Sequence, residues 1–82
     1  MSIVRDVVEV MAKALTDRPD EVQVVESEHT GTTLVELYVA PGELGRVIGG
    51  QGRTAAALRT LAATAGEKAG KTVTLEFRDG RP

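Results

Sequence analysis

Residues 45–53 read Gly-Arg-Val-Ile-Gly-Gly-Gln-Gly-Arg, a stretch that cannot continue a regular helix or strand. Three glycines fall within residues 49–52, and each costs about 0.5–1 kcal/mol relative to alanine inside such an element. Val47 and Ile48 belong to a short apolar set at helical spacing, and an alanine-rich helical pattern begins near Arg53. The stretch therefore predicts a tight, exposed turn between two helices.

A turn of this composition favours an anionic ligand. Glycines let a ligand's backbone approach the peptide N–H groups, and the N-terminus of the following helix carries partial positive charge. Phosphate is the expected ligand. Gly50 is expected to take a backbone geometry that favours glycine, so that a side chain there would stand between the phosphate and the N–H groups.

The rest of the chain supplies one further helix and three strands. The periodicities predict helices over residues 2–16, 43–48 and 53–69, and strands over residues 22–28, 32–40 and 71–78. The order is α-β-β-α-α-β. Because each strand alternates, one face of the sheet should be exposed, which predicts an α+β fold of two layers, a three-stranded sheet with helices on one face.

The predicted core consists of aliphatic positions from each element. They are Ile3, Val4, Val7, Val8, Met11 and Leu15 in the first helix; Thr33, Val35, Leu37 and Val39 in the second strand; Ala55, Leu58, Leu61, Ala62 and Ala65 in the last helix; and Val73, Leu75 and Phe77 in the last strand. The small side chains of the last helix should allow close approach to the sheet. Gly66 is expected to loosen that helix and Gly70 to end it.

Composition limits the function. The 82 residues suffice for one domain, residues 1–82, with a flexible tail from about residue 79. The chain has no cysteine and one histidine, His29, expected as a solvated residue of the hairpin turn, so we expect no metal, no cofactor and no enzymatic activity. It has no apolar run long enough for a membrane span, and a cytoplasmic protein is expected.

Charge is unevenly distributed. The net charge is −2, but the acidic excess lies in residues 1–40, and residues 42–62 carry one acid against three arginines. Of these arginines, Arg46 and Arg53 should reach a ligand at the turn, whereas Arg59 is expected to face solvent. With only Tyr38 and Phe77 as aromatic residues, a platform for stacking bases is nearly excluded.

Two other glycine motifs fit poorly. A P-loop requires lysine and then serine or threonine at the positions held by Gln51 and Gly52. The dinucleotide pattern G-x-G-x-x-A is present over residues 50–55, but it should follow a buried strand rather than a short segment with a glycine and an arginine. Neither nucleotide-binding fold is therefore supported.

The segment Val47-Ile48-Gly49-Gly50-Gln51-Gly52-Arg53 closely resembles the G-x-x-G signature of KH domains, and the element order resembles the bacterial, type II arrangement. Over nearly its whole length the chain is similar to the small single-KH proteins of the KhpA family. The resemblance implies an RNA-binding protein, an RNA chaperone or post-transcriptional regulator. It also implies a homodimer and a partnership with the larger, multidomain KhpB type of KH protein.

The resemblance assigns the RNA-binding residues. About four nucleotides of single-stranded RNA would lie against Gly49, Gly50, Gln51 and Gly52, between Arg46 and Arg53, over an aliphatic floor of Val47 and Ile48. For Ile48, a purely structural role in packing is as strongly favoured as a contact with RNA. The residues themselves do not distinguish RNA from single-stranded DNA.

One departure favours a different function. Many KH loops carry a basic residue at a variable position, but here both variable residues, Gly50 and Gln51, are uncharged. Together with the net negative charge, this leaves a protein-interaction or dimerisation module with little RNA affinity as the alternative.

Overall fold

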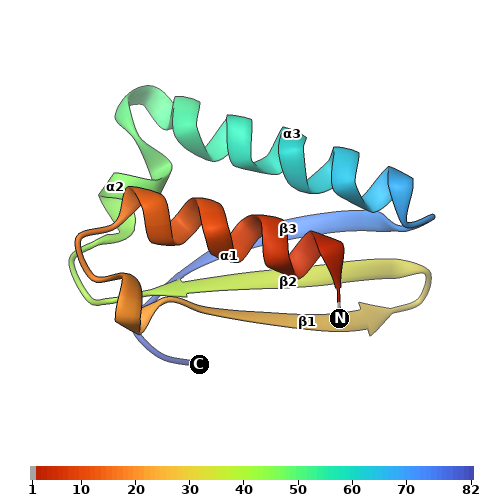
Figure 1. Cartoon of the computed structure of the whole chain (residues 1–82), viewed down its shortest axis with the longest axis horizontal. Helices are drawn as coiled ribbons and strands as arrows, with labels where there is room; N and C mark the ends of the chain where they lie inside the picture. The colour runs from red at the N-terminus through yellow and green to blue at the C-terminus, as the bar shows by residue number, and fades with distance from the viewer. Residues whose placement is uncertain (1) are drawn as a thin grey trace.

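The computed structural model describes residues 2–82 and contains the predicted α-β-β-α-α-β order (Figure 1). The elements are α1 (Ile3–Leu15), β1 (Gln23–His29), β2 (Thr32–Val39), α2 (Leu44–Ile48), α3 (Arg53–Lys68) and β3 (Thr72–Asp79), with short 3-10 turns η1 (Pro19–Glu21) and η2 (Gly50–Gly52). Each predicted helix and strand is present, with its ends within two residues of the expected positions.

The three strands form one mixed sheet in the order β1-β2-β3. β1 and β2 are antiparallel and β2 and β3 are parallel, with Val35 opposite Glu26 on one side and Leu75 on the other. The β1–β2 turn has positive φ at both Thr30 and Gly31, 45° and 81°, as in a type I′ hairpin. His29 is therefore the last residue of β1 and not part of the turn.

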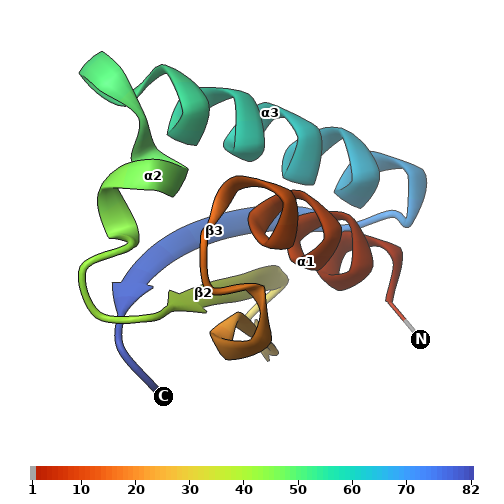
Figure 2. The same ribbon diagram turned by 60° about the vertical axis from the view of Figure 1, so that its left-hand side comes forward.

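All the helices lie on one face of the sheet (Figures 1 and 2). α1 and α3 run side by side in opposite directions, and between them and the sheet lies a core made almost entirely of valine, leucine and alanine. Its members include Val4, Val8, Ala12, Val24, Val35, Leu37, Val39, Val47, Leu58, Ala62 and Leu75. This arrangement confirms the predicted α+β fold of two layers.

Four predictions about the helices are wrong. Ile3, Leu15 and Leu61, expected in the core, are 52%, 36% and 42% exposed, because the apolar stripe of each helix is wider than the face that meets the sheet. Gly66 does not loosen α3, which continues unbroken to Lys68. Gly66 is buried, and an added Cβ would lie 2.5 Å from Val73 Cγ2 and 2.9 Å from the Lys71 carbonyl oxygen, so this glycine permits close helix-to-strand packing.

The C-terminal strand is shifted by one residue toward the C-terminus relative to the prediction. β3 extends through Asp79, and the N–H of Gly80 donates a 2.8 Å hydrogen bond to the Val39 carbonyl. Strand pairing thus reaches two residues further than the expected end at Arg78.

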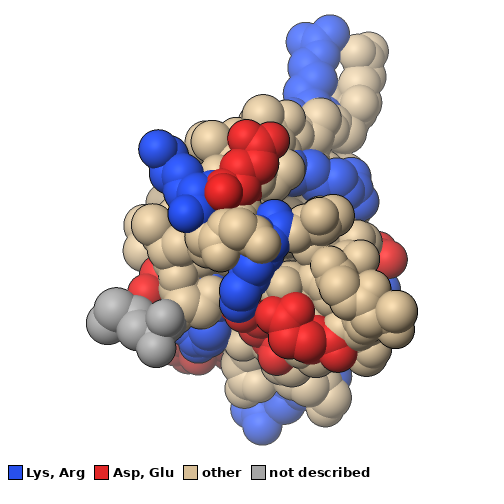
Figure 3. Space-filling model, turned by 90° about the vertical axis from the view of Figure 1, so that its right-hand side faces the viewer, with Lys and Arg blue, Asp and Glu red and all other residues tan. Residues whose placement is uncertain are grey.

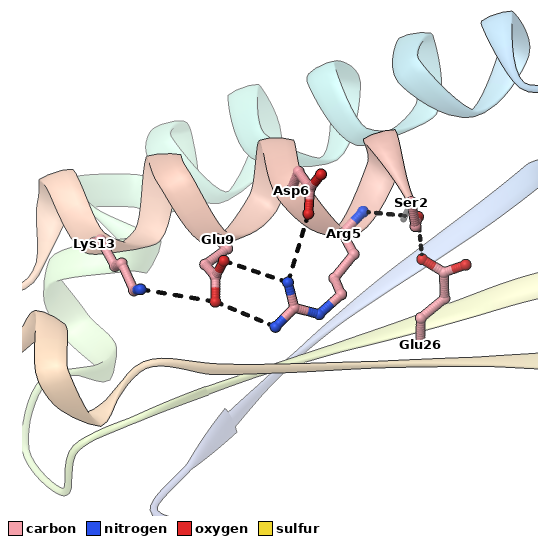
Figure 4. A network of polar contacts seen from close by, with 6 residues as sticks. All are labelled: Ser2, Arg5, Asp6, Glu9, Lys13 and Glu26. Atoms are coloured by element: carbon pink, nitrogen blue, oxygen red, sulfur yellow. Dashed lines mark hydrogen bonds and ion pairs between the residues drawn. The ribbon is translucent and has the colours of Figure 1, made fainter.

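Polar contacts join α1 to the sheet on one flank (Figure 4). Ser2 Oγ accepts from the Arg5 N–H at 3.2 Å and donates to Glu26 Oε1 of β1 at 2.5 Å. Further along, Arg5 and Lys13 both contact Glu9, whose carboxyl pKa is lowered chiefly by the hydrogen bond from Arg5. Charged side chains therefore occupy the flank of α1 above β1.

Acids and bases also alternate at the end of the molecule that contains the β1–β2 turn (Figure 3). There, Lys71 Nζ lies 3.3 Å from both Glu26 and Glu28. This end therefore presents no surface of a single charge. None of the helices formed by residues 2–82 has the length and apolar character needed to cross a membrane.

Candidate nucleic-acid interface

The loop between α2 and α3 has a backbone that demands glycine at specific positions. Gly49 has φ 76° and ψ 171°, a combination almost confined to glycine. Gln51 and Gly52 are both left-handed, with φ values of 58° and 70°. A left-handed conformation costs a non-glycine residue about 1–2 kcal/mol, so Gln51 is held in a strained geometry.

Gly49 is also required by packing. A Cβ added there would lie 2.4 Å from Thr54 Oγ1 and 2.9 Å from Thr54 Cβ, well inside normal contact. Its N–H donates to the Gly45 carbonyl at 2.8 Å, and its own carbonyl accepts from the Gly52 N–H at 3.2 Å. The first turn of α3 therefore packs directly on this residue.

The prediction that Gly50 needs a glycine geometry is wrong. Its φ lies outside the left-handed region, and an added Cβ would meet nothing within 4 Å. The glycine-dependent positions are instead Gly49 and Gly52, which flank the two variable residues of the G-x-x-G motif. A side chain at position 50 would project into solvent, where a ligand would have to lie.

The loop exposes its backbone beside the start of a helix. Gly50 and Gln51 are exposed, and an added Cβ at Gly50 would meet nothing within 4 Å. The N-terminus of α3 at Arg53 has no side-chain cap, so its partial positive charge is not offset by the protein. An exposed glycine-rich backbone and an uncapped helix end together form a surface suited to a phosphate oxygen.

The aliphatic pair before the loop divides between two roles. Val47 is fully buried, at 0% exposure, and belongs to the core. Ile48 is half-buried and retains accessible surface beside Gly49. Only Ile48 can therefore offer its side chain to a ligand without rearrangement, while Val47 fixes α2 to the core.

Arg46, expected at the interface, is engaged by two acids. Its guanidinium lies 2.8 Å from Asp17 and 3.3 Å from Glu43. Glu43 is itself fixed by hydrogen bonds from Thr16 Oγ1 at 2.6 Å and from the Asp17 N–H at 2.7 Å. Any phosphate that approached Arg46 would compete with two carboxylates.

Glu43 stays ionised at neutral pH. The hydrogen bond from Thr16, and after it that from the Asp17 N–H, holds the pKa of this carboxyl below its usual value of 4.5. Since the folded pKa is lower than the unfolded one, the contribution of these bonds to stability is present above pH 4.5 and is lost as pH falls through the folded pKa. The carboxylate partner of Arg46 therefore persists across the physiological range.

Arg53 differs from Arg46 in being available. It is exposed, and the only polar contact of its side chain within residues 2–82 is a 3.0 Å hydrogen bond from Nη2 to Gln51 Oε1. This contact also orients Gln51 across the loop. Of the two arginines predicted at the interface, Arg53 supplies the uncompensated charge.

One relevant pair was missed by the sequence analysis. Arg59, expected to face solvent freely, holds its guanidinium carbon 4.9 Å from the centroid of the Phe77 ring. The two residues are 18 positions apart, and no local spacing signals their contact. The described residues contain no cluster of acids and histidine able to hold a metal ion.

A two-layer α-β-β-α-α-β domain with a G-x-x-G turn between its second and third helices is a KH domain of the bacterial, type II class. The family model described as "KhpA/KhpB, KH domain" matches residues 5–77, and the chain belongs to this family. The resemblance noted in the sequence is thereby confirmed, and the family is one of RNA-binding KH proteins rather than enzymes.

Curated relatives agree over nearly the full chain. The protein named RNA-binding protein KhpA of Aquifex aeolicus is 53% identical over 77 residues, which cover 94% of this chain and 98% of that one. A protein of the same name from Clostridium acetobutylicum is 45% identical, covering 89% and 97%. The chain thus aligns with whole relatives and not with a fragment of them.

A solved structure supports the fold alone. The structure of Aquifex aeolicus Era Y63A bound to GDP.AlF4- matches with a TM-score of 0.62 at 17% identity. The match covers 95% of this chain but 30% of that one.

The loop geometry predicts opposite outcomes for two adjacent substitutions. Gly49→Ala should lower the free energy of unfolding by about 2 kcal/mol or more, because it combines a glycine-only conformation with overpacking against Thr54. Gly50→Ala should change it by less than about 0.5 kcal/mol, since nothing opposes the added methyl group. Urea denaturation of both variants measures the difference, and equal losses would contradict the backbone assignment.

Proposed function

We propose that this chain binds single-stranded RNA without catalysing a reaction. It holds about four nucleotides by their backbone against the loop Gly49–Gly52. The observation that carries the proposal is the exposed backbone of Gly50 and Gln51 beside the uncapped start of α3. The names of the relatives, RNA-binding protein KhpA, support RNA as the ligand. A cytoplasmic role as an RNA chaperone or post-transcriptional regulator follows from the same likeness.

The binding mode assigns different tasks to the predicted residues. Phosphate oxygens lie against Gly49, Gly50, Gln51 and Gly52, and Arg53 provides a cation that no acid neutralises. Ile48 extends an apolar surface beside the loop, and the buried Val47 fixes α2 to the core. Since backbone contacts carry no sequence information, affinity should depend on salt more than on sequence.

Arg46 joins this site only by leaving its acidic partners. Asp17 and Glu43 hold the guanidinium in the free protein, and a phosphate must displace at least Asp17 to reach it. The acids thus weaken binding at the loop, which fits a module that depends on a second copy or a second domain for useful affinity.

Self-association through α1 would supply that second copy. Val10 is 68% exposed at the centre of the helix, and with Val7 and Met11 it lines a shallow apolar hollow. Asp6 and Lys13 lie on either side of Val10, so two antiparallel copies of α1 would place each acid beside the partner's lysine. We propose a homodimer on this face, with a larger KH protein of the KhpB type as a further partner.

The same face supports the alternative function. A domain that had lost RNA affinity could retain α1 as a dimerisation surface, and an uncharged loop would then be expected. The two functions differ in whether the loop or the helix is required for activity, and separate substitutions can test each.

Replacing Gly50 and Gln51 together by aspartate should abolish RNA binding and leave the fold intact. Position 50 has open space, and aspartate tolerates the left-handed conformation at position 51. Two carboxylates would then repel the phosphates.

The matched control replaces both residues by asparagine, which has nearly the same shape and no charge. Filter binding at two salt concentrations, with circular dichroism to verify folding, measures the outcome. If the aspartate variant folds and binds RNA as the parent does, the loop is not the binding site, and the protein-interaction function replaces RNA binding.

Asp17→Asn should strengthen RNA binding by about two- to fivefold, because it releases Arg46 from its closest carboxylate. The affinity should also depend more steeply on salt concentration, by an amount that corresponds to up to one additional phosphate contact. Asp20→Asn makes the same charge change nearby at a residue with no ion pair, and serves as the control. Equal effects of the two substitutions would show that net charge, and not the release of Arg46, is responsible.

Val10→Lys should convert the dimer to a monomer, since it removes apolar surface and places two lysines face to face on the pairing axis. Val25→Lys introduces the same change on the exposed face of the sheet and should leave association unchanged. Sedimentation velocity at micromolar concentration distinguishes the species. A parent that sediments only as a monomer would refute self-association, and a dimeric Val10→Lys variant would refute the assignment to α1.

A further inference from the structure

The contact between Arg59 and Phe77 lies along the edge of the sheet next to the loop. β3 is an edge strand, and Phe77 projects from it toward the helices, where it packs against the core while remaining half-buried. Arg59 is exposed on α3, and its guanidinium carbon is 4.9 Å from the ring centroid. This distance is within the range of a cation–π interaction.

Arg59 has no competing polar partner. Within residues 2–82 no carboxylate forms an ion pair with it and no hydrogen bond involves its guanidinium, in contrast to Arg46. The neighbours one turn away along α3 in both directions are all alanines: Ala55, Ala56, Ala62 and Ala63. No long side chain of α3 therefore covers the face of the guanidinium that points away from Phe77.

The position of Arg59 relates it to the loop. It lies six residues beyond Arg53 on the same helix, fewer than two helical turns. A strand whose backbone rests on the loop and continues along α3 beside β3 would pass over the pair. The charge of Arg59 is thus placed where the strand leaves the phosphate-binding surface.

We propose that Arg59, held over the Phe77 ring, forms a stacking platform for one base of the bound strand. A guanidinium plane stacks on a nucleobase as an aromatic ring does. Phe77 beneath it restricts the side chain to one orientation before binding, so less conformational entropy is lost when the base arrives. The inference rests on the proposed function and adds a base contact to a site otherwise limited to the backbone.

This platform compensates for the scarcity of aromatic residues. The chain has two, and neither lies exposed beside the loop. An arginine supported by a half-buried phenylalanine provides an accessible planar surface without exposing an aromatic ring. Because every base has a π-face, the contact should detect the presence of a base rather than its identity.

The experiment separates stacking from charge. Binding is measured for a short single-stranded RNA and for a strand of the same length in which the bases are absent and only ribose and phosphate remain. The parent is compared with Arg59→Lys, which keeps the charge but loses the plane, and with Arg81→Lys as a control that makes the same change far from the helix. Circular dichroism verifies that each variant is folded.

Arg59→Lys is expected to bind the intact RNA about tenfold more weakly than the parent, as the loss of one stacked base implies, and to bind the abasic strand unchanged. Arg81→Lys should leave both affinities unchanged. If Arg59→Lys binds the intact RNA as the parent does, or loses affinity equally for both strands, the stacking role is refuted and RNA binding by the loop stands. A parent that binds neither strand would overturn the proposed function and this inference together.

Discussion

The parallel pairing of β2 with β3 requires the connection that carries the candidate binding loop. Residues Thr32 to Val39 pair in register with Thr72 to Asp79, and parallel neighbours need a connection that returns across the sheet. Here α2, the loop and α3 provide that return. The chain must therefore reverse direction between two helices at one end of the sheet, and this reversal is the loop that carries the binding surface.

Small side chains make the connection compact. Gly66 lies against Val73, so α3 approaches the start of β3 closely, and Gly49 accepts the side chain of Thr54 against its backbone. The loop is consequently fixed at both ends by packing, and its N–H groups are oriented before a ligand is present. A preorganised surface loses less entropy on binding than a flexible one.

Charge is arranged so that most cations are compensated and a few are not. Arg5, Arg46 and Lys71 contact acids, whereas Arg53 and Arg59 do not. Exposed ion pairs of this kind contribute little to stability. Their effect on function is larger, because Arg53 and Arg59 of α3 remain among the few cations within residues 2–82 that have no acidic partner, in a chain whose net charge is negative.

Local sequence patterns are sufficient to predict the elements, their order, the fold class and the position of the loop. These features depend on local patterns: alternation in strands, helical spacing of apolar residues, and glycines where no helix can continue. The sequence also identified Arg53 as a cation beside the loop, since that residue is adjacent to the glycines in the chain.

Which of these residues are available to a ligand depends on contacts between elements far apart in the chain. Arg46 meets Asp17 across 29 positions, and Arg59 meets Phe77 across 18, contacts that no local pattern encodes. The structure likewise assigned the glycine requirement to Gly49 rather than Gly50, and left Leu61 exposed. The physical reason is that periodicity specifies which side of a helix is apolar, whereas the width of the buried face, the partners of each charge and the backbone geometry of a turn depend on how the elements pack.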